Sequence, residues 1–526
     1  MGTPLNILLV TPDQWRADCL SALGHPTVRT PHIDALAAEG VLFTNHFVQC
    51  SPCGPSRASL LTGMYMMNHR SFRNGTPLDA RFTNIALEMR AVGYDPALIG
   101  YTDTSVDPRV HEPDDPVLSR GYQGVMPGFT PLLLTPFMPP FPTPTQPVGW
   151  MRHLAAKGYD VPEKSFDMYG PENGHAAIGG FGPFDAPARY RAEDSDTAFS
   201  TDCALDFIGS QGADPWFLHL VYLRPHPPYI APEPYNRMYR ADEVPQPRRA
   251  ATPEIEGRQH PFLAWLLKGK SSVVHLDDRE LRLLRATYYG LITEVDDHIG
   301  RLVARLKETG QYDNTLIVIS SDHGDMLGDH WLVGKENTFD GTFHVPLIIR
   351  APGVRFDKER GRRVDAFVEN IDVMPTILDL VGREIPVQCD GCSLAPFLDD
   401  GAPPSWRSAA HGEYDFRDVA DDRAERALGI AFDACGVTVI RDSRYKYLHF
   451  NGLPPLFFDL ESDADEFNDL AGDPAHAATV LEYAQEMLSW RMVHGDHTLT
   501  GNKLTPEGLI TLSRSRRRAP IRAPAE

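Results

Sequence analysis

Two pairs of candidate metal ligands follow apolar runs that lie far apart in the sequence. Asp13 and Gln14 follow an apolar run near the N-terminus, and Asp322 and His323 follow another one much later. Each run is typical of a buried strand, and ligands of open α/β sheets bind beyond the carboxyl ends of strands. Carboxylate and amide oxygens suit a hard divalent ion, and an imidazole shifts the preference toward manganese or another transition ion. Each pair alone is more often a turn or a helix cap, but their shared position at strand ends favours a metal site.

A third candidate is the segment from 50 to 63, which reads Cys-Ser-Pro-Cys-Gly-Pro-Ser-Arg-Ala-Ser-Leu-Leu-Thr-Gly. Its proline and glycine residues predict a turn that enters a short helix at Ser56. Backbone N–H groups and the helix dipole would then favour an anion beside Cys53. Arg57 adds a planar guanidinium suited to phosphoryl or sulfuryl oxygens. The alternative interpretation is a structural cysteine at the start of a helix.

This segment resembles the signature of the sulfatase family, Cys-x-Pro-x-Arg followed by x-x-x-x-Thr-Gly. Cys53 has Pro55 and Arg57 at the required positions, whereas Cys50 has Gly54 where the arginine is needed. Three other segments resemble parts of the same family, namely Asp372–Leu378, Asp390–Leu394 and Leu456–Leu460. The resemblance implies an α/β fold of the alkaline-phosphatase type, with a mostly parallel central sheet flanked by helices and a smaller C-terminal α+β domain. It also implies that an activating enzyme oxidises Cys53 to formylglycine, an aldehyde.

Details of these motifs resemble bacterial phosphonate monoester hydrolases, which also cleave phosphodiesters. Many sulfatases supply two consecutive aspartates early and Asp-Asn late, whereas this chain has Asp-Gln and Asp-His. Tyr101 stands where many sulfatases carry a sulfate-binding lysine, and the segment around Asn74 also looks like that branch. The resemblance therefore implies that Asn74 and Tyr101 bind substrate. Asp103 departs from the pattern, because a neutral threonine is expected there and a carboxylate could repel a charged substrate.

Two further residues match positions of the family, His226 in an Arg-Pro-His-Pro-Pro segment and Lys335 directly after a glycine. The resemblance implies that Cys53, Arg57, His226 and Lys335 are catalytic. The metal ligands that it implies are Asp13, Gln14, Asp322, His323 and the oxidised residue at position 53. We expect one divalent ion, with Mn²⁺ favoured over Ca²⁺ or another divalent ion. In the implied mechanism the hydrated aldehyde attacks phosphorus or sulfur, His226 protonates the leaving oxygen, and the covalent ester breaks to return the aldehyde.

The elements that position these residues alternate apolar runs with helical periodicity, which predicts an α/β domain. Strands are predicted at Asn6–Val10, Phe217–Tyr222 and Thr315–Ser320. A helix between the last two is predicted from apolar residues at 291, 295, 299, 302 and 306, with a stop near Gly310. The proline-rich stretch Met126–Trp150 predicts no regular structure.

The pattern of apolar and polar residues in the sequence changes from about Trp406 onward. Strands of a hairpin are predicted at 436–441 and 445–450, a third strand near 457–460, and a packing helix at 477–490. We therefore predict a catalytic domain over residues 1–405, a smaller domain with an antiparallel sheet over 406–512, and a basic, disordered tail over 513–526.

Composition narrows the class of partner and the compartment. The formal charge of −21 argues against nucleic acid as a partner. No apolar run has the ~18–20 residues of a membrane helix, and no secretory signal is recognisable. Seven cysteines are sparse and odd in number, unlike a disulfide framework. Cys389 and Cys392 form a single CxxC, but Cys392 lies in the segment Asp390–Leu394 that resembles a family turn, so the spacing is attributed to chance. We expect a cytoplasmic protein.

The function predicted from these features is hydrolysis of phosphonate monoesters and phosphodiesters, with promiscuity toward sulfate esters. The alternatives are an arylsulfatase and, more remotely, a catalytically inert binding protein that kept the fold. The expected partners are a small-molecule ester, a formylglycine-generating enzyme for maturation, and further copies of the chain in a dimer or tetramer.

Overall fold

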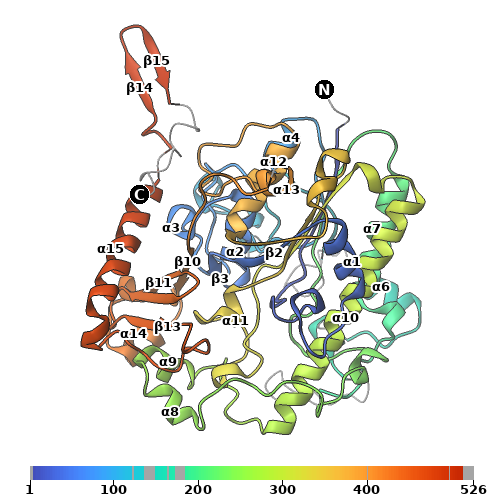
Figure 1. Ribbon diagram of the computed structural model, residues 1–526. Coiled ribbons are helices and arrows are strands. Elements are labelled where there is room, and N and C mark those ends of the chain that lie inside the picture. The colour runs from blue at the N-terminus through green and yellow to red at the C-terminus, as the bar shows by residue number, and fades with distance from the viewer. Residues whose placement is uncertain are drawn as a thin grey trace.

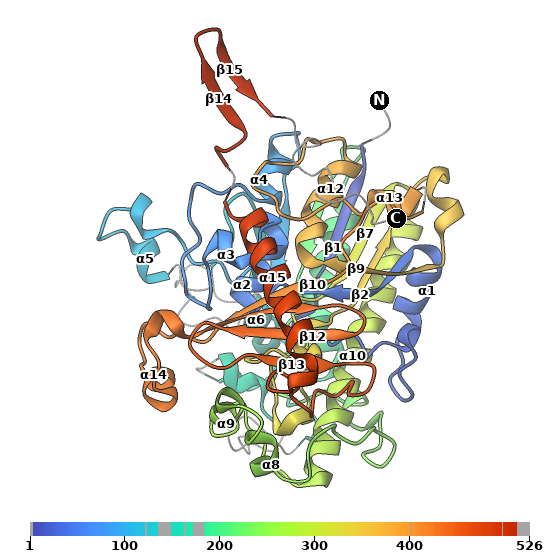
Figure 2. The same ribbon diagram turned by 60° about the vertical axis from the view of Figure 1, so that its left-hand side comes forward.

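The computed structural model describes residues 4–120, 124–134, 149–162, 165–171, 184–399, 401–496 and 498–512. A large sheet is covered by helices on both faces, and a smaller sheet lies beside it (Figures 1 and 2). The strands of the large sheet run in the order β5-β4-β6-β1-β7-β8-β2-β9. Their bounds are Asn6–Val10 (β1), Val41–Phe47 (β2), Ala97–Gly100 (β4), Thr130–Leu134 (β5), Phe217–Leu220 (β6), Thr315–Ser320 (β7), Leu347–Arg350 (β8) and Arg362–Glu369 (β9).

Two of the predicted strands lie in the middle of this sheet. β1 pairs in parallel with β6 on one side and with β7 on the other, where Val10 lies opposite Ile319. β8 runs antiparallel to both of its neighbours, β7 and β2. Every residue of β1 and β7 is buried, which explains their unbroken apolar sequences. The strands predicted at 6–10 and 315–320 are confirmed, and their carboxyl ends lie side by side.

The two faces of the sheet bury alternate residues of the same strands, so the molecule has three layers. Ile7 and Leu9 belong to the core shared with α2, α4 and α12, whereas Leu8 and Val10 belong to the core shared with α1, α7 and α10. The α-helices are α1 (Pro31–Glu39), α2 (Cys53–Thr62), α3 (Met66–His69), α4 (Ile85–Arg90), α5 (Pro116–Arg120), α6 (Gly149–Ala156), α7 (Asp196–Ser210), α8 (Pro253–Gly257), α9 (Pro261–Leu266), α10 (Asp278–Glu308), α11 (Asp340–Phe343), α12 (Val373–Leu380), α13 (Ala395–Asp399), α14 (Arg423–Leu428) and α15 (Ala477–His494).

The long helix α10 is the one predicted from its apolar periodicity. A capping box of Asp277 and Glu280 begins it, and its predicted apolar residues are buried, four of them against the sheet and Leu291 against Ala231 and Tyr235. Gly310, just beyond its end, has a positive φ of 69°, a conformation that glycine adopts without strain. Among the described helices, none is both long enough and apolar enough to cross a lipid bilayer.

The smaller sheet joins the C-terminal part of the chain to the cysteine segment. Its order is β13-β12-β11-β10-β3, with bounds Leu456–Asp459, Tyr445–Phe450, Gly436–Arg441, Ala410–Asp415 and Cys50–Ser51. The predicted hairpin is confirmed as β11 and β12, and α15 packs on this sheet through Tyr483 and Met487. β3, directly before Cys53, pairs in parallel with β10. The smaller sheet therefore includes residues from the N-terminal region, while the domain boundary at 405 stays a prediction.

Two local predictions are wrong. Thr130–Leu134, inside the stretch predicted to lack regular structure, forms the strand β5, and α6 begins at Gly149. β5 lies at the edge of the sheet, where Pro131 can be accommodated because an edge strand need not donate on its outer side. The cysteine helix begins at Cys53 instead of Ser56. Residues 135–148 of the proline-rich stretch and the basic tail lie outside the described residues.

The end of the described chain forms a hairpin that was not predicted. β14 (Asn502–Thr505) pairs with β15 (Gly508–Thr511) in a sheet of their own. This hairpin projects from the body beyond the end of α15 (Figures 1 and 2). Its apolar side chains Leu504, Leu509 and Ile510 are exposed.

Candidate active site

The predicted metal ligands meet at the carboxyl ends of β1 and β7. Asp13, Cys53, Asp322 and His323 each offer a ligand atom, and these atoms all lie within 4.8 Å of one another. All four residues are buried. The arrangement follows from the fold, because neighbouring parallel strands end at the same edge of the sheet.

The N-terminus of α2 brings Cys53 to this edge. Pro52 is the N-cap, and the side chain of Asn74 accepts a hydrogen bond from Gly54 N at 2.8 Å. Pro55 costs the helix nothing, because the N–H groups of a first turn have no intrahelical acceptor. Lys335 Nζ donates to Cys53 Sγ at 2.9 Å. The thiol therefore lies at a helix N-terminus and beside a cation, where an anionic group is favoured.

Arg57, one turn further along α2, bonds to two of the carboxylates. Its Nε donates to Asp322 Oδ2 and its Nη2 to Asp13 Oδ2, both at 2.9 Å. Its Nη1 donates to Tyr101 O at 2.9 Å, and the guanidinium lies 4.2 Å from the centre of the Tyr101 ring. The structure thus places Arg57 behind the candidate metal ligands, where it holds two buried carboxylates together.

The charges of this cluster shift the pKa values of its members. Burial opposes ionisation of Asp13, but Lys335, His226 and Arg57 together hold its pKa well below the ordinary value. Burial and then the charge of Asp13 raise the pKa of the Cys53 thiol, so the thiol stays protonated at neutral pH. Burial lowers the pKa of the His323 imidazole. At neutral pH the cluster combines carboxylates, a neutral imidazole and the Lys335 cation.

The donor set fits a divalent cation. Asp13 Oδ1 is buried and accepts no hydrogen bond from the residues that the structure describes. His323 Nδ1 lies 3.1 Å from Gly324 O, and because a carbonyl only accepts, Nδ1 carries the proton in the neutral ring. The lone pair of His323 Nε2 therefore points into the cluster, 3.3 Å from Cys53 Sγ and 3.8 Å from Asp13 Oδ1. An unpartnered carboxylate oxygen beside an oriented imidazole is what a metal site requires.

Gln14 is held at the edge of the cluster by two residues to which no role was assigned from the sequence. Its amide nitrogen contacts Asp325 Oδ2, and Tyr229 donates to the same oxygen at 2.5 Å. Lys335 Nζ donates to Gln14 Oε1 at 3.0 Å. Asp325 could have been found from the sequence because it belongs to the same strand end as Asp322, whereas nothing local pointed to Tyr229.

The residues predicted to bind substrate line the same region. Tyr101 donates its hydroxyl to Asp13 Oδ2 at 2.5 Å. Asn74 uses its Oδ1 to cap α2, so its Nδ2 is the donor that it can offer to a ligand. Asp103 Oδ2 lies 3.7 Å from Arg57 Nε. Burial raises the pKa of Asp103 to about 7, although the Arg57 guanidinium opposes the shift. The departure at this position therefore places a buried, partly protonated carboxyl group in the site.

His226 lies in the loop after β6 and is close enough to Asp13 and Lys335 for their charges to act on it. Its Nδ1 lies 2.6 Å from Pro227 O. Burial and then Lys335 lower its pKa to about 3, so the ring is neutral at pH 7 in the free protein. Since the carbonyl fixes the Nδ1 proton, Nε2 is the nitrogen that takes up and delivers a further proton.

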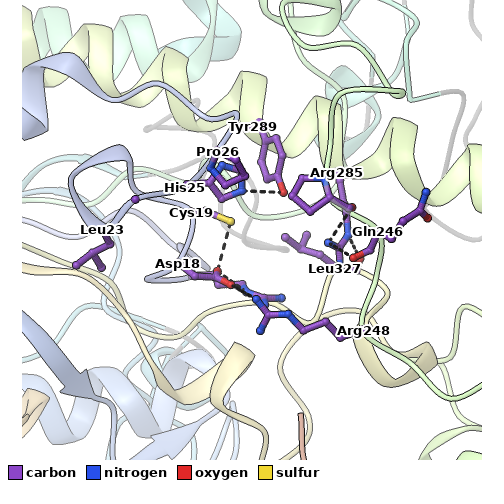
Figure 3. Close-up of a pocket in the computed structure, with 13 residues that line it drawn as sticks. Asp18, Cys19, Leu23, His25, Pro26, Gln246, Arg248, Arg285, Tyr289 and Leu327 are labelled. Carbon is purple, nitrogen blue, oxygen red and sulfur yellow. Dashed lines mark hydrogen bonds and ion pairs between the residues drawn. The ribbon is translucent and has the colours of Figure 1, made fainter. Parts of the chain in front are cut away.

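A separate cleft of about 190 Å³ opens beside the site (Figure 3). Arg16, two residues after Gln14, reaches from its wall to Asp325 O at 3.2 Å. Polar side chains of the cleft bond to one another: Arg16 pairs with Asp18, and His25 pairs with Tyr289 (Figure 3). In the described part of the chain, none of the predicted site residues lines this cleft.

Comparisons with known proteins identify the family of this chain. The sequence profile named Sulfatase matches residues 5–383, and the profile of the N-sulphoglucosamine sulphohydrolase C-terminal region matches residues 328–492. The chain is 45% identical to the multifunctional alkaline phosphatase superfamily protein PehA of Trinickia caryophylli, over 97% of this chain and 99% of that protein. An arylsulfatase of Clostridium perfringens is 27% identical over 95% and 97% of the two chains.

Two solved structures are similar to this chain in three dimensions as well as in sequence. The phosphonate monoester hydrolase of Agrobacterium radiobacter is 44% identical, with a TM-score of 0.91 over 97% of this chain and 100% of that one. The phosphonate monoester hydrolase of Silicibacter pomeroyi is also 44% identical, with a TM-score of 0.89 over 97% and 99%. The predicted fold class is thereby confirmed, and the chain belongs to the sulfatase family of the alkaline phosphatase superfamily.

Proposed function

We propose that this protein hydrolyses phosphonate monoesters and phosphodiesters with a formylglycine made from Cys53. The observation that carries the proposal is the buried cluster of Asp13, Cys53, Asp322 and His323 beside Lys335. Full-length similarity to two phosphonate monoester hydrolases supports the choice of substrate. In this structure Cys53 Sγ stands in for the oxygen that the oxidised side chain would carry.

The cluster would hold one divalent cation through Asp13, Gln14, Asp322, His323 and the oxidised residue 53. Two carboxylates and an amide oxygen suit a hard ion, and the imidazole favours Mn²⁺ over Ca²⁺. When bound, the cation supplies Lewis acidity and a lowered pKa for a coordinated hydroxyl. Arg57 fits this proposal as a positioning residue, because it pairs with two of the carboxylates and keeps both at the site.

The chain's own donors are arranged to bind a tetrahedral monoanion. Lys335 Nζ lies 2.9 Å from the Cys53 sulfur, so it would contact an oxygen of any group attached there. Asn74 offers its Nδ2, and the N-terminus of α2 contributes the positive end of its dipole. These donors would stabilise the negative charge that spreads over the equatorial oxygens during displacement.

His226 is our candidate for the proton donor to the leaving oxygen. The neutral ring of the free protein must first gain a proton on Nε2, and a bound anionic ester favours this because an adjacent negative charge raises the pKa of an imidazole. The charge that develops on the leaving oxygen strengthens the same interaction. A general acid of this kind contributes roughly 10²–10⁴-fold to the rate.

We predict that His226→Asn lowers kcat/KM, and that the loss is larger when the leaving alcohol of the ester is less acidic. Aryl esters of acidic phenols need little protonation, so their kcat/KM should change little, whereas phenyl esters should lose about 10²-fold or more. For phenyl esters the protonated fraction of His226 grows as pH falls, so wild-type kcat/KM should fall with rising pH and the variant should lose this dependence. Equal losses for all leaving groups would contradict the assignment.

An arylsulfatase is the second candidate function, supported by the family and by the likeness to the Clostridium enzyme. Phosphonate monoesters, phosphodiesters and sulfate monoesters are all monoanions, so one site can accept all three. We expect kcat/KM for an aryl phosphonate and an aryl phosphodiester to exceed that for the aryl sulfate with the same phenol. The reverse order, measured on the same metal-replete preparation, would favour the arylsulfatase.

Maturation by a formylglycine-generating enzyme and a cytoplasmic location belong to the same proposal. All seven cysteines lie in the described part of the chain and form no disulfide there, which is typical of a reducing compartment. Unmodified Cys53 in protein from a host that has the activating enzyme would favour an inert binding protein instead.

We further propose that the chain forms a homo-oligomer through α15 and the terminal hairpin. Leu488 and Met492 on α15 and Leu499, Leu504 and Leu509 beyond it are 60% exposed or more. Exposed apolar side chains gathered in one region mark interaction surfaces. Removal of residues 499–526 should lower the solution mass to that of a smaller assembly, measured by light scattering. Paired charge substitutions on the exposed face of α8 serve as the control, and an unchanged assembly after truncation would contradict the proposal.

A further inference from the structure

The loop that carries His226 has few N–H groups of its own. Residues 224–228 read Arg-Pro-His-Pro-Pro, and three of these five residues are prolines without an N–H group. His226 N donates to Leu223 O at 2.9 Å and Ile230 N donates to Pro228 O at 2.8 Å, so the other carbonyl oxygens of the loop need side-chain donors. A buried loop without them would be unstable and poorly ordered.

Arg224 supplies these donors. Its Nη1 donates to His226 O at 3.0 Å and to Pro228 O at 2.8 Å, the two carbonyls on either side of Pro227. The third carbonyl of the series, Pro227 O, is the one that lies against His226 Nδ1. Three consecutive carbonyls are thus fixed by Arg224 and by the imidazole together, and the direction of Nε2 follows from the direction of the loop.

Arg224 is itself held rigidly. It is completely buried, its Nη2 donates to Tyr190 Oη at 2.9 Å, and its guanidinium lies 4.7 Å from the centre of the Tyr169 ring. Asp196, at the start of α7, provides the neighbouring negative charge at 3.9 Å from Nε. A lysine could supply charge here, but it lacks the planar fork that reaches two carbonyls and a hydroxyl at once.

We propose that Arg224 is a positioning residue that orients His226 toward the leaving oxygen. This inference rests on the proposed function, because it gives Arg224 no contact with substrate and makes its effect depend on proton donation by His226. It predicts that substitution of Arg224 has the kinetic effect of a partial loss of His226 and not the effect of a general loss of stability.

The test compares Arg224→Lys with wild type on aryl esters of one charge type whose phenols differ in pKa. We expect kcat/KM to fall at least about tenfold for the phenyl ester and to change little for the most acidic phenol. Tyr190→Phe removes only the hydroxyl that accepts a hydrogen bond from Arg224. It should change the dependence of kcat/KM on the pKa of the phenol by less, and it serves as the test if Arg224→Lys folds poorly.

Arg350→Lys is the matched control. Arg350 is also buried, its Nη1 donates to the carbonyls of Tyr312 and Thr315, and it stacks on the Tyr312 ring at 3.9 Å. It is the last residue of β8 and lies beside the amino end of β7, whereas the site lies at the carboxyl end of β7. This variant should lower the melting temperature without changing the dependence of kcat/KM on the leaving group.

A double-mutant cycle separates the outcomes. In an His226→Asn background, Arg224→Lys should cause no further loss that depends on the leaving group. Two results would overturn the inference while the proposed function stands. One is an Arg224→Lys variant whose kcat/KM depends on the leaving group as in wild type. The other is a double variant in which Arg224→Lys causes the same loss that depends on the leaving group as it causes in wild type. If wild type cleaves aryl sulfates and not phosphonates, the proposed substrate fails, and the same cycle on aryl sulfates decides the role of Arg224.

Discussion

Replacement of Cys53 with serine should abolish multiple turnover while leaving the fold intact. Loss of a catalytic nucleophile costs roughly 10⁴-fold or more in kcat. A hydrated aldehyde has a second hydroxyl whose proton can leave, and the electron pair then re-forms the aldehyde and expels the phosphonate anion. Serine has no such group, so any phosphoryl group that it accepts should remain attached. The measurement is kcat for an aryl phosphonate together with the intact mass after incubation with substrate.

Cys50→Ser is the control for this prediction. Cys50 is buried three residues earlier on β3, and its sulfur lies 3.5 Å from Ser59 Oγ, away from the metal cluster. We expect this variant to keep formylglycine at position 53 and most of its activity. Substantial turnover by the Cys53→Ser variant would contradict the proposed nucleophile.

Replacement of Asp322 with asparagine should deprive the protein of both metal and activity. The Asp322 carboxylate accepts hydrogen bonds from Arg57 Nε and from the backbone of Gln14 and His323; an amide keeps the shape but removes the charge and turns one of the two acceptor atoms into a donor. A Lewis-acidic ion is worth several kcal/mol, so we expect kcat/KM to fall by about 10³-fold or more. Metal content by elemental analysis should fall in parallel.

Asp329→Asn is the matched control for the aspartate variant. Asp329 is equally buried and pairs with Arg16 and Arg285, but it is not in the cluster of ligand atoms. Its loss should lower the free energy of unfolding while metal content stays at the wild-type level. Full metal content and activity in Asp322→Asn would show that the ion, if any, binds elsewhere.

Much of the framework could be predicted because its signals are local. β1 and β7 are unbroken apolar runs, as expected for strands buried on both faces, and α10 shows a clear helical period. The position of ligand residues just beyond β1 and β7 then followed from the topology of parallel sheets. These features depend on the sequence of one segment at a time.

Other features depend on contacts between distant segments. β3 has two residues, too few for any periodic signal, and it exists because β10 pairs with it. Pro131 in β5, together with the other prolines of the stretch 126–150, suppressed the prediction of a strand, and the place of β5 at the edge of the sheet makes this strand possible. The guanidinium of Arg57 was expected to face substrate oxygens, but the structure shows it bonded to Asp13 and Asp322. A sequence motif identifies a cationic side chain, but it does not identify the anionic group that this side chain binds in the folded protein.

The central claim is tested most directly by relating activity to the chemical state of residue 53. Protein made with graded amounts of a formylglycine-generating enzyme, and saturated with Mn²⁺, would be assayed and its peptide containing position 53 weighed by mass spectrometry. We predict that kcat per molecule rises in proportion to the fraction of aldehyde and extrapolates to zero when all of Cys53 is unmodified. Full activity in protein whose Cys53 is entirely a thiol would contradict the account.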